Sequence, residues 1–302
     1  MKIGDREIWP GSPAYIVAEI GINHNGDLVL ACELIAAAVE AGANAVKFQM
    51  RSITESIPDH MIDRRKDTPW GEMSYLEYKQ RLEFSHEAYI HVFRSMADRY
   101  DVDLGVSVWG REAAQQAANM HNFQETGTYD SIFDFLKIPS AFMREDRTLH
   151  MVATRGIPFF WSTGMHTEEE VLQTRQDLHR YGADNYGILY CNSMYPTPNN
   201  RLNLNAMKNW ITSSKFGPFP IGYSGHETGL ATTLAARAMG AVIIERHITM
   251  DRAMWGSDQA ASVEPQGFAR LVRDIRSIEE ALGSWKKVVY PEELEKRKEL
   301  LP

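Results

Sequence analysis

Two histidines, His226 and His247, each close a short apolar run that is typical of a buried strand. His226 ends Gly-Tyr-Ser-Gly-His, and His247 ends Val-Ile-Ile-Glu-Arg-His. Neutral imidazole is a common ligand of divalent metals, and a metal held there would polarise a carbonyl group. A single histidine at a strand end is more often a hydrogen-bonded core residue, so the prediction of a metal site depends on the pair.

Two lysines lie inside apolar runs, where a lysine is rarely found unless its charge is paired. Lys47 interrupts the run Ala45 to Gln49, and Lys137 interrupts the run Phe135 to Ser140. We infer that the two ammonium groups face a shared anion. The alternative, that the side chain reaches out to solvent at the end of the fold, stays open for either lysine alone.

Polar side chains close the other apolar runs at the same relative position. They are, in chain order, Glu19, Gln49, Ser107, Ser140, Ser162, Cys191, Ser193 and Ser224. The serine hydroxyls would hydrogen-bond the oxygens of a phosphate or a carboxylate. A serine at such a position also caps helices, so the prediction depends on the set rather than on any one member.

Eight apolar runs alternate with amphipathic stretches, which is the element count of a (β/α)8 barrel. The expected strands are Tyr15 to Ile20, Ala45 to Phe48, Leu104 to Val108, Phe135 to Ile138, Phe159 to Ser162, Ile188 to Cys191, Ile221 to Tyr223 and Val242 to Glu245. Helices are expected over 27–41 and 230–239, and a capping box of Thr167 with Glu170 begins another. Barrels of this class carry their active sites at the carboxyl ends of the strands, so the polar side chains should converge on one face.

A doubly wound sheet is the alternative fold, and it would place a glycine-rich turn after the first strand. The segment Gly21 to Gly26 follows that strand but lacks the G-x-G-x-x-G spacing. We therefore predict an α/β fold, a single-domain (β/α)8 TIM barrel over residues 1–285, followed by a short charged tail over 286–302. The segment Arg51 to Phe84 is too long and too charged for a tight connection and is expected to cover the site.

The composition limits the partners and the compartment of the chain. Its 302 residues are 44% hydrophobic, enough for a large core, and the net charge of -8 argues against a nucleic-acid partner. Two cysteines, Cys32 and Cys191, indicate no disulfide framework. No apolar run reaches the length of a membrane span and no signal peptide is recognisable, so we expect a cytoplasmic protein that does not bind membranes.

The motifs at these strand ends resemble those of the sialic acid synthase family, over roughly residues 1–285. They are Ala18–Gly26, Val46–Gln49, Lys137–Ser140, Ser162–Met165, Tyr195–Pro198, Gly222–His226, Glu245–His247 and Gly256–Asp258. The resemblance implies a transferase that forms a carbon–carbon bond. Such an enzyme condenses phosphoenolpyruvate with a sugar aldehyde to a 2-keto-3-deoxy acid of the N-acetylneuraminate type and releases phosphate.

The resemblance also implies roles for individual residues. Phosphoenolpyruvate would be held by Lys47, Lys137, Ser140, Ser162, Ser193 and Ser224, with Ser107 beside them. A divalent metal, Mn2+ or Mg2+, would be held by His226 and His247. The acceptor aldehyde would be surrounded by Glu19, Gln49, Tyr195 and Asp258. Either Glu19 or a water on the metal would transfer protons, and we expect a homo-oligomer.

Two departures from the family concern the acceptor sugar. Many members carry a carboxyl-terminal antifreeze-like domain that brings an arginine to the acceptor, whereas we expect this chain to be a short form without it. Phe142 stands where the family has a glutamate. We therefore expect Arg64, Arg65 and Trp70 of the 51–84 segment to contact a different or more anionic sugar.

Two other functions stay open. A buried lysine with a lowered pKa can form an imine with a carbonyl substrate, which would make the protein a Schiff-base aldolase that uses Lys137 or Lys47. The altered acceptor residue also allows a non-catalytic module that binds sugar acids. The presence of both lysines and both histidines favours the metal-assisted synthase over these two.

Overall fold

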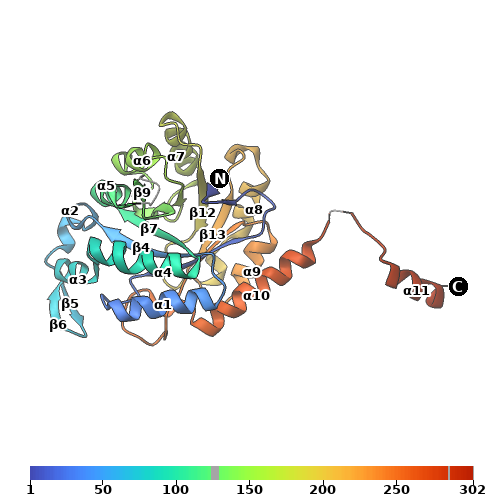
Figure 1. Ribbon diagram of the computed structural model, residues 1–302. Coiled ribbons are helices and arrows are strands. Elements are labelled where there is room, and N and C mark those ends of the chain that lie inside the picture. Colours follow the sequence, from blue (N-terminus) through green and yellow to red (C-terminus); the bar gives the residue numbers. More distant parts are fainter. Residues whose placement is uncertain (124–128, 285, 302) are drawn as a thin grey trace.

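Eight parallel strands close into one barrel in the computed structural model, which describes residues 1–123, 129–284 and 286–301 (Figure 1). The strands are β3 (Tyr15–Gly21), β4 (Ala45–Arg51), β7 (Asp103–Trp109), β10 (Phe135–Ile138), β11 (Phe159–Ser162), β12 (Tyr186–Cys191), β13 (Ile221–Gly225) and β14 (Ile243–His247). They follow one another around the barrel in chain order, and β14 pairs with β3 to close it. The predicted (β/α)8 barrel and all eight predicted strands are confirmed, with changes only at the strand ends.

Helices connect these strands and cover the outside of the barrel (Figure 1). They are α1 (Leu28–Glu40), α4 (Arg94–Tyr100), α5 (Arg111–Asn119), α6 (Asp146–Ala153), α7 (Glu168–Arg180), α8 (Leu204–Thr212), α9 (Ala231–Ala238) and α10 (Pro265–Leu282). Asp27 caps α1 through the amides of Val29 and Leu30. Thr167 and Glu170 form the predicted capping box of α7, in which each side chain accepts a hydrogen bond from the other residue's amide.

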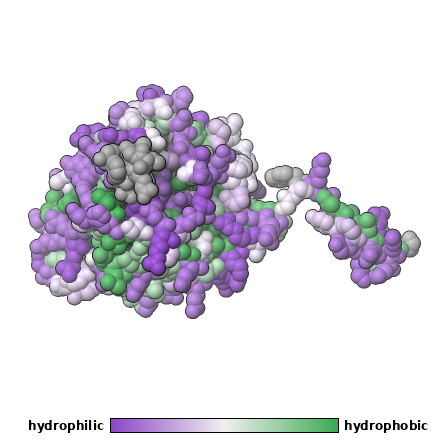
Figure 2. Space-filling model, in the orientation of Figure 1, coloured by the Kyte–Doolittle hydropathy of each residue, from purple (hydrophilic) through white to green (hydrophobic). Residues whose placement is uncertain are grey.

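Shorter elements complete the described chain. They are β1 (Lys2–Ile3), β2 (Arg6–Glu7), η2 (Ala88–Phe93), β8 (His121–Phe123), β9 (Tyr129–Ser131), η3 (Ser140–Phe142), η4 (Asn199–Arg201), η5 (Ser214–Phe216), η6 (Gln259–Ala261) and α11 (Pro291–Leu300). Every residue of α11 is exposed, and this helix lies apart from the barrel (Figure 1). No helix of the described residues is long and apolar enough to span a bilayer, and the face in Figure 2 is largely hydrophilic.

The interior of the barrel is apolar at one end and polar at the other. Tyr15, Phe135, Phe160 and Ile243 fill the amino-terminal end, and Ile3 of the first hairpin packs beneath them. The carboxyl ends of the same strands carry the charged and hydroxyl side chains. This division leaves the polar chemistry on one rim, because the opposite end is closed by a solid apolar core.

The predicted excursion between β4 and η2 is ordered. It consists of α2 (Ile53–Ser56), η1 (Asp59–Met61), the hairpin of β5 (Arg65–Thr68) and β6 (Gly71–Ser74), and α3 (Tyr75–Leu82). Tyr78 and Leu82 of α3 form a small apolar cluster with Ile22, against which Trp70 and Trp255 pack. The excursion therefore stands on the rim beside the loop that follows β14.

A buried ion pair fixes the two strands that carry the histidines. Arg246 of β14 and Glu227, just after β13, are both fully buried, with 3.1 Å between Nη1 and Oε1. Glu227 also accepts hydrogen bonds from Tyr223 and Thr233, and Arg246 donates to the Gly229 carbonyl. Removing one partner of such a pair destabilises the fold strongly, because the other charge then stays buried without a counter-charge. Replacing both partners with apolar side chains costs much less.

We predict that Glu227→Ala lowers the free energy of unfolding by about 3–5 kcal/mol, since it leaves the Arg246 guanidinium without a counter-charge. The matched control is Glu72→Ala, which removes an exposed partner of Arg65 and should cost less than about 1 kcal/mol. Urea unfolding followed by circular dichroism measures both. Equal losses in the two variants would contradict the assigned role of the buried pair.

Candidate active site

The carboxyl end of the barrel holds a cavity of about 210 Å3 that collects most of the predicted site residues. Ten of them line it, namely Glu19, Gln49, Ser107, Lys137, Ser140, Ser162, Ser193, Tyr195, His226 and His247. The parallel register explains the convergence, because His247 pairs with Glu19, Glu19 with Lys47, and Gln49 with Ser107. Side chains from different strands therefore stand at the same height on the rim.

The other three predicted residues adjoin this set, directly or, for Ser224, through Glu245, which contacts Lys137. Lys47 is fully buried and donates a hydrogen bond to Ser107, with 2.6 Å between Nζ and Oγ. Ser224 donates to Glu245, with 2.8 Å between Oγ and Oε1. Asp258 faces His247, with 3.8 Å between Oδ2 and Nδ1. The structure thus brings all thirteen residues together.

Two lysines and two glutamates form a charge cluster below the cavity. Lys47 contacts Glu19 and lies 3.4 Å from Glu245, measured from Nζ to Oε2. Lys137 lies 2.5 Å from the other oxygen of Glu245. All four side chains are buried, so the charges have little solvent to screen them and depend on one another.

The pKa values of this cluster follow from burial and from the opposing charges. Burial lowers the pKa of Lys47, against the pull of Glu19 and Glu245. Burial also acts to lower the pKa of Lys137, but Glu245 and Glu19 outweigh it and raise that pKa. The two ammonium groups hold the pKa of Glu245 well below its ordinary value, although burial alone would raise it. The Lys137 side chain at the cavity surface is therefore protonated and positively charged.

The serines Ser140, Ser162 and Ser193 line the cavity together with Lys137. The Gly164 amide donates to Ser140, with 3.0 Å between N and Oγ, and lies 3.2 Å from the Cys191 sulfur. A Cβ added at Gly164 would collide with the Ser193 hydroxyl. The Ser162 hydroxyl is buried without a hydrogen-bond partner among the described residues. The arrangement leaves hydroxyl donors for a ligand that carries oxygens.

His226 and His247 lie side by side with 5.6 Å between their ring centroids. The Nδ1 of His226 is 2.7 Å from the Asn192 carbonyl, and its Nε2 is 3.0 Å from the Tyr195 hydroxyl. The carbonyl accepts a hydrogen bond from a protonated Nδ1, which leaves Nε2 as the electron-pair donor. Burial, and next the neighbouring His247, lower the pKa of His226 to about 3. This imidazole is therefore neutral at physiological pH.

The donor set fits a divalent metal that keeps most of its coordination for water or substrate. His247 Nδ1 is buried without a hydrogen-bond partner among the described residues, and neutral imidazole nitrogen is the ligand form that metals bind. No group of three or more histidine, cysteine or carboxylate side chains in the described chain is arranged to hold a metal by itself. Two protein ligands are consistent with a site that is completed by solvent and substrate.

A hydrogen-bonded chain runs outward from Glu19. Gln49 donates to Glu19 and accepts from Arg51, and Arg51 pairs with Glu83 at 3.2 Å. Gly21, at φ +58°, packs closely against this chain: a Cβ there would lie 3.1–3.2 Å from Gln49, Glu19 and His247. A larger residue at this position would therefore displace the amide, the carboxylate or the imidazole.

The residues predicted to contact a changed acceptor have other neighbours. Phe142 is buried and packs edge-to-face against Trp109, whose ring lines the cavity. Arg65 pairs with Glu72 on the exposed hairpin, and Trp70 packs against Arg81. None of the described residues 52–84 lines the cavity itself. The excursion flanks the site from the side of Asp258, as a wall beside the cavity.

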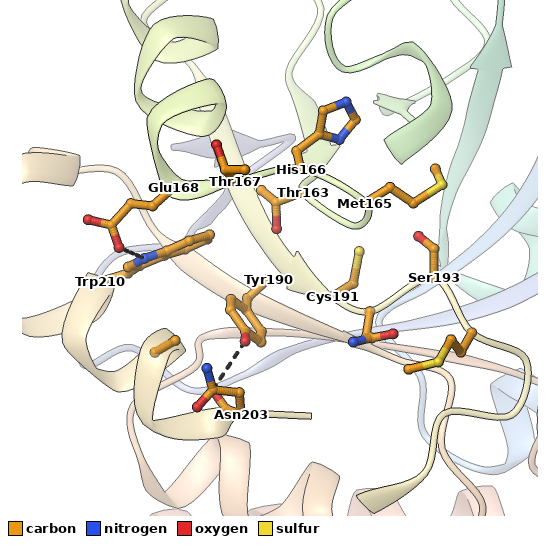
Figure 3. Close-up of a pocket in the computed structure, with 13 residues that line it drawn as sticks. Thr163, Met165, His166, Thr167, Glu168, Tyr190, Cys191, Ser193, Asn203 and Trp210 are labelled. Atoms are coloured by element: carbon orange, nitrogen blue, oxygen red, sulfur yellow. Dashed lines mark hydrogen bonds between the residues drawn. The ribbon is translucent and has the colours of Figure 1, made fainter. Parts of the chain in front are cut away.

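A second cavity, of about 530 Å3, adjoins the first and is drawn in Figure 3. Met165 and Ser193 line both cavities. The floor of the second cavity is formed by Tyr190, whose hydroxyl donates to the Asn203 carbonyl, and by Trp210, whose indole donates to Glu168 (Figure 3). The first cavity is the better candidate for chemistry, because Lys137, Glu19, His226 and His247 line it and none of them lines the second.

Sequence reasoning gave no role to three residues that contact this site: Glu245, Gly164 and Arg51. Glu245 was visible only as part of a motif, because its two cationic partners are distant in the sequence. Arg51 was read as the start of a loop, although it ends β4. Two lysines in apolar strands require counter-charges, and this requirement is the signal that points to a buried glutamate on a neighbouring strand.

The fold and the site define a (β/α)8 barrel with two buried lysines, a set of serine hydroxyls and two imidazoles gathered on one rim. The sequence model of the NeuB family matches residues 34–287. The chain belongs to the NeuB family, and it is a sugar-acid synthase, a transferase that forms a carbon–carbon bond.

Similar proteins support this assignment. Human N-acetylneuraminate-9-phosphate synthase is 35% identical over 290 residues, which cover 95% of this chain and 76% of the human protein. The N,N'-diacetyllegionaminic acid synthase of Legionella pneumophila is 32% identical over 93% of this chain and 76% of its own. The crystal structure of a sialic acid synthetase from Leptospira borgpetersenii, in complex with citrate, superposes with a TM-score of 0.82 at 27% identity, over 99% of this chain and 96% of that one.

The neutral histidines predict a specific pH dependence of stability. Burial lowers the pKa of both His24 and His226 from 6.5 to about 3. Below pH 6.5 these two histidines bind protons in the unfolded chain but stay unprotonated in the folded protein. The free energy of unfolding therefore falls as pH falls. Each histidine should contribute about 2 kcal/mol to the loss between pH 7.5 and pH 5.

We predict that His226→Gln reduces the loss of unfolding free energy between pH 7.5 and pH 5 by about 2 kcal/mol. Urea unfolding in the presence of a chelator measures this loss. The matched control is His179→Gln on the exposed side of α7, which should leave the dependence unchanged. Protonation of His226 near pH 6 in a nuclear magnetic resonance titration would contradict the prediction.

Proposed function

We propose that the protein condenses phosphoenolpyruvate with a sugar aldehyde to a 2-keto-3-deoxy acid of the nonulosonic type, and releases phosphate. The observation that carries this proposal is the cavity in which the Lys137 ammonium, the serine hydroxyls and the imidazoles of His226 and His247 meet. The names of the relatives, which are synthases of sialic and legionaminic acids, support the same class of product.

The anionic substrate would lie over the charge cluster. Lys137 and Lys47 supply positive charge, while Ser140, Ser162 and Ser193 supply hydrogen-bond donors for its oxygens. Glu245 holds both ammonium groups in place before the substrate arrives, and Ser224 fixes one of its oxygens. The substrate would then meet a preorganised surface rather than two mobile side chains.

Bond formation joins C3 of phosphoenolpyruvate to the aldehyde carbon. The electron pair of the C2–C3 double bond forms the new bond, so C2 becomes electron-poor and the aldehyde oxygen becomes negative. The Glu19 carboxylate lies beside the cavity and can stabilise positive character at C2. Water then adds to C2, and phosphate leaves with cleavage of its C2–O bond. Lewis-acid polarisation of the aldehyde is the chemistry that Mn2+ or Mg2+ held by His226 and His247 would supply.

A Schiff-base aldolase is the competing function, and the lowered pKa of Lys47 favours it. Lys47 is fully buried below the cavity, however, and its amine contacts Glu19 and Ser107. Lys137 lines the cavity, but its raised pKa keeps it protonated and therefore poorly nucleophilic. Borohydride treatment in the presence of substrate separates the two mechanisms, because only an imine is trapped as a covalent adduct.

A cytoplasmic location and a homo-oligomeric state belong to the same proposal. Sedimentation at micromolar concentration tests the second of these, and a monomer would contradict it.

We predict that chelation abolishes phosphate release from phosphoenolpyruvate and that added Mn2+ or Mg2+ restores it. His226→Ala and His247→Ala should each lose Mn2+ binding, measured by electron paramagnetic resonance, because only two protein ligands are proposed. His179→Ala is the control and should bind as the wild type does. Full activity in a metal-stripped preparation would contradict the metal proposal.

We predict that Lys47→Ala and Lys137→Ala each raise the KM for phosphoenolpyruvate roughly 100-fold, since each removes one cation from a buried anion site. Lys208→Ala, on the exposed face of α8, is the matched control. Phosphate release is the assay, and circular dichroism confirms folding, because each variant also leaves a buried glutamate less well paired. An unchanged KM in both folded variants would exclude the assigned anion site.

A further inference from the structure

The carboxamide of Gln49 stands between the active-site cavity and a buried arginine. Its nitrogen donates to Glu19, with 2.9 Å between Nε2 and Oε1, and its oxygen accepts from the Arg51 guanidinium. The main-chain carbonyl of Gln49 accepts from the Tyr89 hydroxyl, with 3.2 Å between the two oxygens. Gln49 is therefore held at its backbone as well as at both ends of its side chain.

The chemistry of the two neighbours sets the direction of this carboxamide. A carboxamide can turn over with little change in its shape, and the turn exchanges the donor NH2 group with the acceptor oxygen. A guanidinium can only donate hydrogen bonds, and a carboxylate can only accept them. Arg51 on one side and Glu19 on the other therefore permit one orientation, in which the NH2 group faces the carboxylate. Without Arg51 the Gln49 oxygen can turn toward Glu19, where two acceptors repel each other.

Arg51 is itself anchored by the excursion. Glu83, directly after α3, accepts from the Arg51 main-chain amide at 3.0 Å and from the Arg51 Nη1 at 3.2 Å. The guanidinium carbon lies 4.8 Å from the ring centroid of Trp109, so an aromatic face covers the cation. The Arg51 side chain is 5% exposed and the Glu83 side chain 17%. These contacts hold the guanidinium in one orientation, with Nη2 toward Gln49.

Arg51 reaches the cavity only through its neighbours. Glu19, Gln49 and Trp109 line the cavity, whereas Arg51 is not among the described residues that do. One route leads from the guanidinium through the carboxamide to Glu19, and the other leads through the Trp109 ring. Lys47 contacts Oε2 of Glu19, so Gln49 supplies the contact that fixes the other oxygen. The route through the carboxamide is the one that bears on the reaction, because the Glu19 carboxylate is proposed to stabilise positive character at C2.

We propose that Arg51 is a positioning residue of the synthase, which orients the Gln49 carboxamide so that its NH2 group holds the Glu19 carboxylate in place beside the substrate. This inference rests on the proposed function, since Glu19 must face C2 of phosphoenolpyruvate. Glu83 joins the excursion to the same chain of contacts. The positive character at C2 develops in the transition state, so the loss of Arg51 should lower kcat more than it changes the KM for phosphoenolpyruvate.

The test variant is Arg51→Met/Glu83→Gln, which removes both charges and leaves no buried charge unpaired. We expect kcat to fall about 10- to 100-fold, with the KM for phosphoenolpyruvate within about 2-fold of wild type. The matched control is Arg237→Met/Glu279→Gln. That pair, at 3.0 Å, has side chains 5% and 13% exposed, and Arg237 donates to the Ala241 carbonyl ahead of β14, at the apolar end of the barrel. The control should lose similar stability in urea and keep kcat.

A double-mutant cycle identifies the route. In a Gln49→Met background, Arg51→Met/Glu83→Gln should change kcat by less than about 2-fold, because the carboxamide through which Arg51 acts is already absent. In a Trp109→Phe background the same change should lower kcat by the full factor. If the test variant does not fold, Arg51→Gln replaces it: a glutamine keeps a donor for Glu83 but can present either end to Gln49, so the same loss of kcat is expected.

Three outcomes overturn the inference: an unchanged kcat in the folded variant, losses that multiply in the Gln49→Met background, and a loss that disappears in the Trp109→Phe background. The absence of phosphate release with every aldose would instead refute the proposed function. In that case the side-chain NH2 resonances of Gln49, identified by their loss in Gln49→Met, decide the role of Arg51. Their exchange with solvent should be at least about 10-fold faster in Arg51→Met/Glu83→Gln than in wild type, and equal rates would overturn the inference.

Discussion

The buried cluster of Lys47, Lys137, Glu19 and Glu245 is the interaction on which the rest of this site depends. Removing four charges from water is costly, and the cost is met only when opposite charges and hydrogen bonds surround each of them. The barrel provides that surrounding, because Glu19 pairs in register with Lys47 on the next strand, and Glu245 and Lys137 reach the same interior from neighbouring levels of their strands. A shift of one residue in the pairing register of any of these strands would point a charged side chain outward, into the apolar layer between the barrel and the helices.

The constraint explains why the two ends of the barrel differ so strongly. Phe135, Phe160 and Ile243 pack the amino-terminal end and leave no space for solvent there. Above them the cluster is open on one side, toward the cavity and its serines. A ligand that brings negative charge completes the cluster from that side, so the same charges that restrict folding also select the ligand.

The strands could be predicted because each is an apolar run whose polar residue stands at its carboxyl end. This pattern is local, and it places Lys47, Lys137, His226 and His247 without any knowledge of the neighbours. The prediction ended β4 at Phe48, whereas the strand continues to Arg51, since Arg51 is held by Glu83 on the far side of the excursion. That contact depends on tertiary structure, which no local pattern contains.

The remaining parts of the site were harder to predict for the same physical reason. Glu245 resembles any strand residue until Lys137, distant in the sequence, is placed next to it. The Gln49 carboxamide resembles any polar group at a strand end until Arg51 and Glu19 are seen at its two ends. Compensation of charge is a property of the assembled fold, so the sequence predicts which groups need partners more readily than it predicts which partners they have.

The two halves of the site are built from different kinds of structure. The lysines, serines and histidines stand on strand ends, where neighbouring strands fix their positions within the barrel. The wall on the side of Asp258 depends on the 51–84 excursion and on the loop that carries Trp255, which pack through a small aromatic cluster of their own. Changes in such a cluster alter the loops without disturbing the strand ends. With the acceptor on that side, as proposed, the chemistry of the rim can stay constant while the choice of acceptor changes.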